Sequence, residues 1–181
     1  HIYGIDPFNE VDSPNWNEEF LSNVSKKIYE SLSNVDPEAK WLQMTWMFYH
    51  AKEKWTPSRI KAFLRAVPQD KLILLDYYCD HTEIWKNIES YYGQPYIWCY
   101  LGNFGGNTMM VGDLNDTDMK INRVLAEGGD NVYGLGVTLE AFDVNSLMYE
   151  FVFDKAWNQT QSTDEWIEMW AKCRGGQKDK N

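Results

Sequence analysis

Residues 71–78 read Lys-Leu-Ile-Leu-Leu-Asp-Tyr-Tyr, and the four consecutive apolar side chains at 72–75 form the clearest strand pattern in the sequence. A strand that is apolar on both sides is typical of a parallel sheet covered on both faces. The polar residue Asp76 follows the apolar run directly. The stretch therefore predicts a buried parallel strand that ends in a carboxyl group.

Further strand patterns lie on both sides of this stretch, with helical patterns between them. The strand patterns cover residues 2–10, 39–48, 96–101 and 132–140. Apolar residues at helical spacing or helix-capping signals cover residues 17–32, 57–67, 82–92, 116–126 and 147–157, with Thr56 and Thr82 as caps of the second and third segments. The alternation predicts an α/β fold of about five β/α units.

Both a barrel and a doubly wound sheet fit this alternation. No Gly-x-Gly-x-x-Gly or P-loop sequence follows a strand, which weakens the case for a nucleotide-binding sheet. Polar and aromatic residues gather where the strands end: Asn9, Glu10, Trp46, Asp76, Asn103 and Glu140. Because (β/α)8 barrels build their active sites from the carboxyl ends of several strands, the pattern favours a TIM-type barrel.

The composition changes near residue 158. Residues 1–158 carry the β/α pattern, but a complete (β/α)8 barrel needs about 250 residues. Since the sequence also begins at His1 rather than Met, we interpret residues 1–158 as the C-terminal part of a TIM-barrel domain. A polar segment and helical spacing from Trp166 to Trp170 follow, so residues 159–181 predict a linker and the first helix of an all-α domain, with a frayed end at 178–181.

The chain is acidic, with a formal net charge of −10 and a pI near 4.7. Proteins that bind nucleic acid neutralise phosphates with Lys and Arg, so the charge argues against that class of partner. Aromatic residues make up 15% of the chain, including nine Trp and eleven Tyr. Some of these rings must fill the core, but rings also stack on the apolar faces of sugars, so a carbohydrate partner fits the composition.

The three cysteines, Cys79, Cys99 and Cys173, indicate neither a disulfide framework nor a zinc site. They are odd in number, form no Cys-x-x-Cys pair and have no ligand spacing to His50 or His81. We therefore expect no metal and no cofactor. No apolar run approaches the ~20 residues of a membrane-spanning helix, so we expect no membrane span, and the sequence specifies no oligomeric state.

Glu10 and Glu140 each stand at the exit of a strand-like run, so a parallel barrel would bring both to one rim. Hydrolysis of a glycosidic bond uses two carboxyl groups, one to protonate the leaving oxygen and one to meet the sugar carbon. Plainer roles stay open for each. Glu10 also fits a helix-cap or surface carboxylate, and Glu140 fits the first turn of a helix, where the dipole favours negative charge.

Other residues at the strand ends are candidates for contact with a sugar. The amide of Asn9 could bond a hydroxyl or acetamido group, and Trp46 and Trp98 fit either sugar platforms or plain wall residues. Asp76 fits a group that orients a hydroxyl or one that pairs with an arginine.

Four motifs occur together in order along the chain: residues 3–10 (Tyr-Gly-Ile-Asp-Pro-Phe-Asn-Glu), residues 41–48 (Trp-Leu-Gln-Met-Thr-Trp-Met-Phe), residues 97–101 (Ile-Trp-Cys-Tyr-Leu) and residues 103–107 (Asn-Phe-Gly-Gly-Asn). On these motifs the chain resembles the α-N-acetylglucosaminidases of glycoside hydrolase family 89. The resemblance extends from the first motif to Trp166, Trp170 and Arg174-Gly175, which look like the start of that family's helical domain.

The resemblance implies a retaining exo-hydrolase that removes terminal α-linked N-acetylglucosamine from glycans. It implies that Glu10 is the general acid/base and that Glu140 is the nucleophile. The residues implied to line the sugar pocket are Asn9, Trp46, Trp98, Cys99 and Asn103. The settings in which the family works imply a secreted, periplasmic or lysosomal protein.

The chain departs from the family pattern at several places. Gly102 stands where the family usually has His, Leu139-Glu140-Ala141 stands for Pro-Glu-Gly, and Met44-Thr45-Trp46 stands for Gln-Gly-Trp. Two alternatives to the hydrolase therefore stay open: a degenerate homologue that binds glycans without turnover, and a retaining glycosidase for a different sugar.

Overall fold

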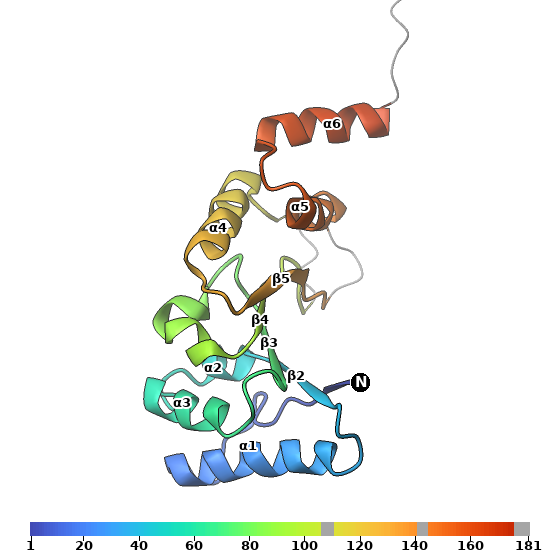
Figure 1. Cartoon of the computed structure of the whole chain (residues 1–181). Helices are drawn as coiled ribbons and strands as arrows, with labels where there is room; N and C mark the ends of the chain where they lie inside the picture. The colour runs from blue at the N-terminus through green and yellow to red at the C-terminus, as the bar shows by residue number, and fades with distance from the viewer. Residues whose placement is uncertain (106–110, 141–144, 176–181) are drawn as a thin grey trace, which may run out of the picture.

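The structure is a computed structural model that describes residues 1–105, 111–140 and 145–175. Five strands form one parallel sheet in the order β1-β2-β3-β4-β5, the same as their order in the sequence (Figure 1). They are β1 (Ile2–Gly4), β2 (Lys40–Met44), β3 (Leu72–Asp76), β4 (Tyr96–Tyr100) and β5 (Val132–Val137). Sequential parallel pairing with helical crossovers is the barrel topology, so the predicted partial barrel is confirmed.

The sheet is open at two edges. Among the described residues, β1 pairs only with β2, and β5 pairs only with β4. The ladder continues past the ends of the strands, because the backbone N–H of Thr45 donates to Leu75 and that of Thr138 donates to Tyr100, each at 3.0 Å. These bonds tie the strand exits to one another and fix the loops that follow.

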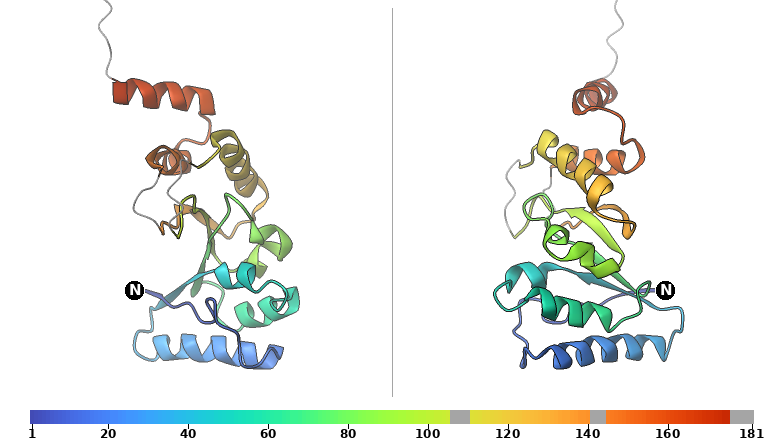
Figure 2. Two further views of the ribbon diagram at one scale, coloured as in Figure 1. Left: turned by 180° about the vertical axis from the view of Figure 1, so that it is seen from behind. Right: turned by 60° about the vertical axis from the view of Figure 1, so that its left-hand side comes forward.

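Two of the helices begin where the sequence predicts, after Asn17 and after Thr56. The longer helices are α1 (Glu18–Ser33), α3 (Pro57–Arg65), α4 (Leu114–Glu127), α5 (Ser146–Trp157) and α6 (Thr163–Gly175). The side chain of Asn17 accepts from the N–H of Glu19, and that of Thr56 accepts from the N–H of Arg59, which satisfies donors that a helix start leaves unpaired. Helices α1 and α3 lie side by side, and α6 lies at the far end of the molecule from α1 (Figure 2).

The core lies between the sheet and these helices. Alternate strand residues such as Trp41, Leu74 and Trp98 are fully buried and pack with residues of the helices in one cluster. The rings of Trp41 and Phe63 meet at 5.9 Å in an edge-to-face arrangement. Much of the aromatic content is therefore core, because large rings fill the layer between sheet and helices.

The strand predicted at residues 39–48 is too long. It stops at Met44, and Trp46 begins the short helix α2 (Trp46–His50). The N–H of Phe48 donates to the carbonyl of Thr45, so the chain turns as soon as it leaves the sheet. The apolar run of Met47 and Phe48 reflects burial in the core, which periodicity alone does not distinguish from a strand.

The helix predicted at residues 82–92 is also wrong. Two short 3₁₀ turns occupy this region, Ile84–Asn87 and Glu89–Gly93, and Glu83 rather than Thr82 precedes the first. Ser90, Tyr91 and Tyr92 have positive φ angles, which excludes a regular helix. Tyr91 is fully buried against Tyr96, so packing overrides the local helical pattern.

Helix α6 confirms the predicted helix around Trp166 and extends it in both directions. Its Trp166 ring lies 4.9 Å from Phe151 of α5, and its indole N–H donates to Asp154 at 2.8 Å. The predicted boundary at residue 158 stays a prediction, and the predicted frayed end at 178–181 lies outside the described residues.

Candidate active site at the carboxyl ends of the strands

The segment after β1 is tied to β2 before it reaches Glu10. The indole N–H of Trp41 donates to the carbonyl of Ile5 at 2.7 Å, and the carboxylate of Asp6 accepts from the N–H of Met44 at 2.7 Å. Partial burial raises the pKa of Asp6. Phe8 and Glu10 have φ angles of 61° and 52°, a region that L-residues rarely adopt and that recurs at functional sites.

Glu10 is exposed at the rim formed by the carboxyl ends of the strands, and its carboxylate accepts a hydrogen bond from one aromatic side chain. The indole N–H of Trp46 donates to Oε1 of Glu10 at 3.0 Å. Trp46 is the first residue of α2 and is half-buried. Its ring stacks on His50 at 6.1 Å and meets the ring of Tyr77 at 6.0 Å. The short helix after β2 therefore places an indole against the carboxylate that follows β1.

Glu140 is exposed at the same rim, three residues beyond the end of β5. The hydroxyl of Tyr77, just beyond β3, donates to Oε1 of Glu140. Burial, followed by the hydrogen bond to Glu140, raises the pKa of Tyr77 well above its ordinary value, so this hydroxyl stays a protonated donor. Sequence reasoning missed Tyr77, although its position directly after the strand-end residue Asp76 was a signal.

The two glutamates are thus joined through a continuous set of contacts. Glu10 contacts Trp46, the Trp46 ring packs against Tyr77, and Tyr77 contacts Glu140. These four side chains follow four different strands, β1, β2, β3 and β5. The carboxyl ends of parallel strands meet at one edge of a sheet, and the structure brings the two predicted carboxylates to that edge together.

The other predicted site residues lie at different depths. Asn9 is half-buried beside Glu10 in the sequence, and Cys99 of β4 is almost fully buried, with its thiol against Gly136 of β5. Burial raises the pKa of Cys99, so the thiol is neutral. Asn103 is fully buried, and its side-chain oxygen accepts from the N–H of Asn145 at 3.3 Å. Asn103 thereby ties the loop after β4 to the start of α5.

The structure does not bring Trp98 to the rim. Its side chain is fully buried in the core cluster between the sheet and the helices, and its indole N–H donates to Glu83 at 3.4 Å. Successive strand residues point to opposite faces, so Trp98 and its neighbour Cys99 cannot line the same side of β4. The position of Trp98 therefore supports the interpretation as a plain wall residue and not as a sugar platform.

Asp76 also points away from the rim. It is fully buried, its Oδ2 accepts from the N–H of Trp85 at 3.2 Å, and burial raises its pKa to about 7. Within the part of the chain that the structure describes, neither an arginine nor a rim hydroxyl pairs with it. The strand-end position was correct, but the side chain belongs to the core.

A hollow of about 580 Å³ lies beside Glu10. It is lined by Phe8, Glu10, Val11, Asp12, His50, Ala51, Glu53 and Lys54. The ammonium of Lys54 pairs with Asp12 at 2.5 Å on one wall. Residues 1–105, 111–140 and 145–175 contain no group of three His, Cys, Asp or Glu side chains placed to hold a metal ion.

Gly102, a departure from the family pattern, has a steric explanation in this chain. Its φ angle is +67°, and a Cβ built on it would lie 2.6 Å from Cε1 of Tyr100. The N–H groups of Leu101 and Gly102 donate to the carboxylate of Asp80 at 2.9 and 3.1 Å. A histidine cannot occupy position 102 in this backbone without moving the Tyr100 ring. The next residues of that motif, 106 and 107, lie outside the described residues, as does Ala141.

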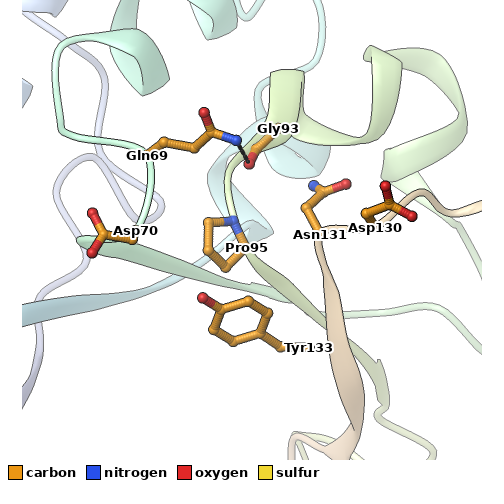
Figure 3. A pocket seen from close by; sticks show the side chains of 7 residues that line it. All are labelled: Gln69, Asp70, Gly93, Pro95, Asp130, Asn131 and Tyr133. Carbon is orange, nitrogen blue, oxygen red and sulfur yellow. Dashed lines mark hydrogen bonds between the residues drawn. The ribbon is translucent and has the colours of Figure 1, made fainter.

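A second hollow, of about 460 Å³, lies at the opposite end of the strands (Figure 3). Gln69 and Asp70 precede β3, Pro95 precedes β4, and Asp130 and Asn131 precede β5. The amides here bind the backbone: Gln69 donates to the carbonyl of Gly93 at 3.0 Å, and Asn131 donates to the carbonyl of Gln94 at 2.6 Å. The N-terminal end of the strands is therefore built for stability.

Comparison with known proteins gives a consistent result. The α-N-acetylglucosaminidase TIM-barrel domain matches residues 1–159. Human α-N-acetylglucosaminidase is 33% identical over 178 residues, which are 97% of this chain and 24% of the human protein. The chain thus spans about a quarter of the length of that relative.

Solved structures of a family 89 glycoside hydrolase from Clostridium perfringens are also similar. The complex with PUGNAc superposes with a TM-score of 0.81 at 27% identity, covering 98% of this chain and 19% of the other. A variant of that enzyme with two glutamate-to-glutamine substitutions, bound to its substrate GlcNAc-α-1,4-galactose, superposes with a TM-score of 0.80 at 25% identity, covering 98% and 19% of the two chains. The fold, the rim of paired carboxylates and these matches together establish that the chain belongs to the α-N-acetylglucosaminidase family, glycoside hydrolase family 89, as part of its TIM-barrel domain.

Proposed function

We propose that the chain supplies both catalytic carboxyl groups of a retaining exo-α-N-acetylglucosaminidase. The observation that carries the proposal is the rim on which Glu10 and Glu140 are linked through Trp46 and Tyr77. Support also comes from the substrate complex of the bacterial relative, which was obtained with two glutamates replaced by glutamine. Two carboxyl groups are what a double displacement needs.

In this mechanism Glu10 is the general acid/base and Glu140 is the nucleophile. Glu140 attacks the anomeric carbon while Glu10 protonates the departing glycosidic oxygen, which gives a covalent glycosyl-enzyme. Glu10 then takes a proton from water, and that water breaks the bond to Glu140 and releases the sugar. The indole N–H of Trp46 orients the carboxyl of Glu10, and the hydroxyl of Tyr77 orients that of Glu140.

The substrate in the proposal is a glycan with a terminal α-linked N-acetylglucosamine. The exposed face of the aromatic cluster around Trp46 and the half-buried Asn9 border the rim where the sugar would lie. Cys99 and Asn103 support the sugar pocket indirectly. They stabilise β4 and the loop that follows it. No metal or cofactor takes part in this mechanism.

The family supports an exported location, whether secreted, periplasmic or lysosomal. None of the helices in the described ranges combines the length and the apolar character needed to cross a membrane. Three N-glycosylation sequons, at Asn23, Asn115 and Asn158, are compatible with export.

The test is an assay of a protein that contains this chain within a complete barrel, using an aryl α-N-acetylglucosaminide. Release of the aryl group with retention of the anomeric configuration is expected. No release, together with measurable binding of N-acetylglucosamine, would instead support the degenerate glycan-binding homologue. The departures from the family pattern at Gly102 and around Glu140 favour that alternative. Activity on aryl glycosides of the other anomer or of other sugars would support a different specificity.

The chain alone is proposed to be inactive. Strands β1 and β5 each leave an unpaired edge among the described residues, and the rim is closed on one side only. Turnover by the isolated 181-residue chain would contradict this part of the proposal.

A further inference from the structure

Tyr77 lies at the centre of the rim, and its backbone N–H, its carbonyl and its hydroxyl each form a hydrogen bond. Its side chain is 6% exposed. Its backbone N–H donates to Oγ1 of Thr45 at 3.2 Å, and its carbonyl accepts from Oγ1 of Thr138 at 2.8 Å. Thr45 and Thr138 follow β2 and β5, so the backbone of Tyr77 is clamped between the exits of two other strands.

The side chain of Tyr77 faces the two loops that carry the glutamates. Its ring packs edge-on against Trp46, which holds Glu10, and its hydroxyl donates to Glu140. Thr138, which holds the carbonyl of Tyr77, lies two residues before Glu140 in the sequence. The same residue is therefore bonded to the loop of Glu140 at two points, one through the backbone and one through the side chain.

The charges around the Tyr77 hydroxyl keep it a donor. The ionisable groups that face it are the carboxylates of Glu140 and Asp6 and the thiol of Cys99, from the loops after β5 and β1 and from β4. Negative charge nearby opposes ionisation of a phenol, as burial does. A protonated phenol donates one hydrogen bond, and the acceptor of the Tyr77 hydroxyl is Glu140.

We propose that Tyr77 is the positioning residue of the nucleophile: its clamped backbone fixes the phenol, and the phenol fixes the orientation of the Glu140 carboxylate for attack. The proposal rests on the proposed function, because it assigns Tyr77 a task only if Glu140 attacks a sugar. It adds a residue that the sequence motifs did not single out, and it couples the two catalytic loops through one side chain. A carboxylate held at one oxygen presents its other oxygen in a defined direction, which is what a displacement at carbon requires.

The test uses Tyr77→Phe in the protein with a complete barrel, with Tyr133→Phe as the matched control. Phenylalanine keeps the ring against Trp46 and removes only the hydroxyl. Tyr133 is 53% exposed and lies at the opposite end of the strands. For Tyr77→Phe we expect kcat/KM on aryl α-N-acetylglucosaminides to fall about 10- to 100-fold, the effect of losing a hydrogen bond to a charged group. Tyr133→Phe is expected to retain wild-type kcat/KM.

Two further readouts separate positioning from general damage. The loss is expected to be equal for good and poor leaving groups, because the nucleophile and not the acid is affected. The affinity for free N-acetylglucosamine, measured by calorimetry, is expected to stay within about twofold of wild type. Binding of this product does not involve attack by Glu140, so it does not depend on how the carboxylate is oriented.

A second variant covers the case in which Tyr77→Phe does not fold. Thr138→Val removes the hydroxyl that holds the carbonyl of Tyr77 and leaves the phenol in place. We expect a smaller fall in kcat/KM, about fivefold, again independent of the leaving group. Wild-type kinetics in Tyr77→Phe, or in a folded Thr138→Val when Tyr77→Phe is unfolded, would overturn the positioning role alone. An inactive parent enzyme would overturn the proposed function and this inference with it.

Discussion

The two ends of the sheet carry similar residue types and use them differently. At the carboxyl end, Glu10 and Glu140 are exposed, and each accepts from an aromatic donor. At the amino end, Asp70 and Asp130 are exposed beside Gln69 and Asn131, whose amides bind backbone carbonyls. Hollows of comparable size lie at both ends, about 580 Å³ and about 460 Å³.

The difference lies in what the polar groups are bonded to. The amides of Gln69 and Asn131 bind carbonyls of neighbouring loops, so they contribute to stability. Carboxylates held by one donor each keep their remaining oxygen free to act on a substrate. The volume of a hollow therefore does not identify the site, whereas the partners of its polar groups do.

The largest expected effect is at the carboxyl end. Glu140→Gln removes the proposed nucleophile, so no glycosyl-enzyme forms and turnover falls by about 10⁴-fold or more. Steady-state release of an aryl group, with mass spectrometry to detect the covalent intermediate, measures the effect. Asp130→Asn, an acid-to-amide change at the amino end, is the control and is expected to keep wild-type activity. Equal losses in the two variants would remove the distinction between the ends.

Glu10→Gln is expected to cost less and to depend on the substrate. General acid catalysis contributes about 10²–10⁴-fold, and it matters most when the leaving group is a poor one. A series of aryl α-N-acetylglucosaminides with increasingly acidic phenols measures the dependence. The loss should shrink as the phenol becomes more acidic. A loss that is the same across the series would contradict the acid role.

The pH dependence of stability tests whether the carboxyl group of Asp76 belongs to the core and not to the rim. Burial raises its pKa to about 7 from an ordinary value of 3.8, so the folded state binds the proton more tightly than the unfolded state does. The resulting penalty is absent below about pH 4, grows as pH rises and is complete above about pH 7. Asp76→Asn lacks this component, so its stability relative to wild type should improve by a few kcal/mol between pH 4 and pH 8.

Chemical denaturation of both proteins at the two pH values measures this change. Asp80→Asn, at a carboxylate near the surface of the same loop, provides a comparison. A difference between Asp76→Asn and wild type that does not vary with pH would show that the carboxyl group has the same pKa in the folded and unfolded protein, and would contradict the raised pKa.

The smallest expected effect is at the amino end. Asn131→Ala removes the amide that donates to the carbonyls of Ser90 and Gln94, so the free energy of unfolding should fall by about 1–3 kcal/mol. Because no substrate contact is involved, kcat/KM at a temperature well below unfolding should stay at the wild-type value. A loss of activity without a loss of stability would place function at this end as well.

Much of the fold could be predicted from local pattern, and two of the errors have a common cause. Continuous apolar runs located the five strands, and caps such as Thr56 located helix starts. The errors at residues 46–48 and 82–92 both involve buried aromatic residues, Phe48 and Tyr91. Tertiary packing of a large ring outweighs propensities that differ by less than about 1 kcal/mol per residue.

The candidate site could be predicted in part. Position at a strand exit was sufficient to select Glu10, Glu140 and Trp46, since a parallel sheet brings all such exits to one edge. The same rule selected Asp76, and the family resemblance selected Trp98, but the side chains of both lie in the core. It missed Tyr77, because a contact between residues 77 and 140 depends on how two loops approach across the sheet.

The sequence by itself determined the parallel α/β class, the order of the strands and the two glutamates at their exits, because apolar periodicity and strand-end position are local properties. The tertiary structure alone decided which donor each glutamate has and which face each aromatic ring occupies. Those choices depend on strand parity and on contacts between residues far apart in the chain, such as Glu10 with Trp46 and Tyr77 with Glu140.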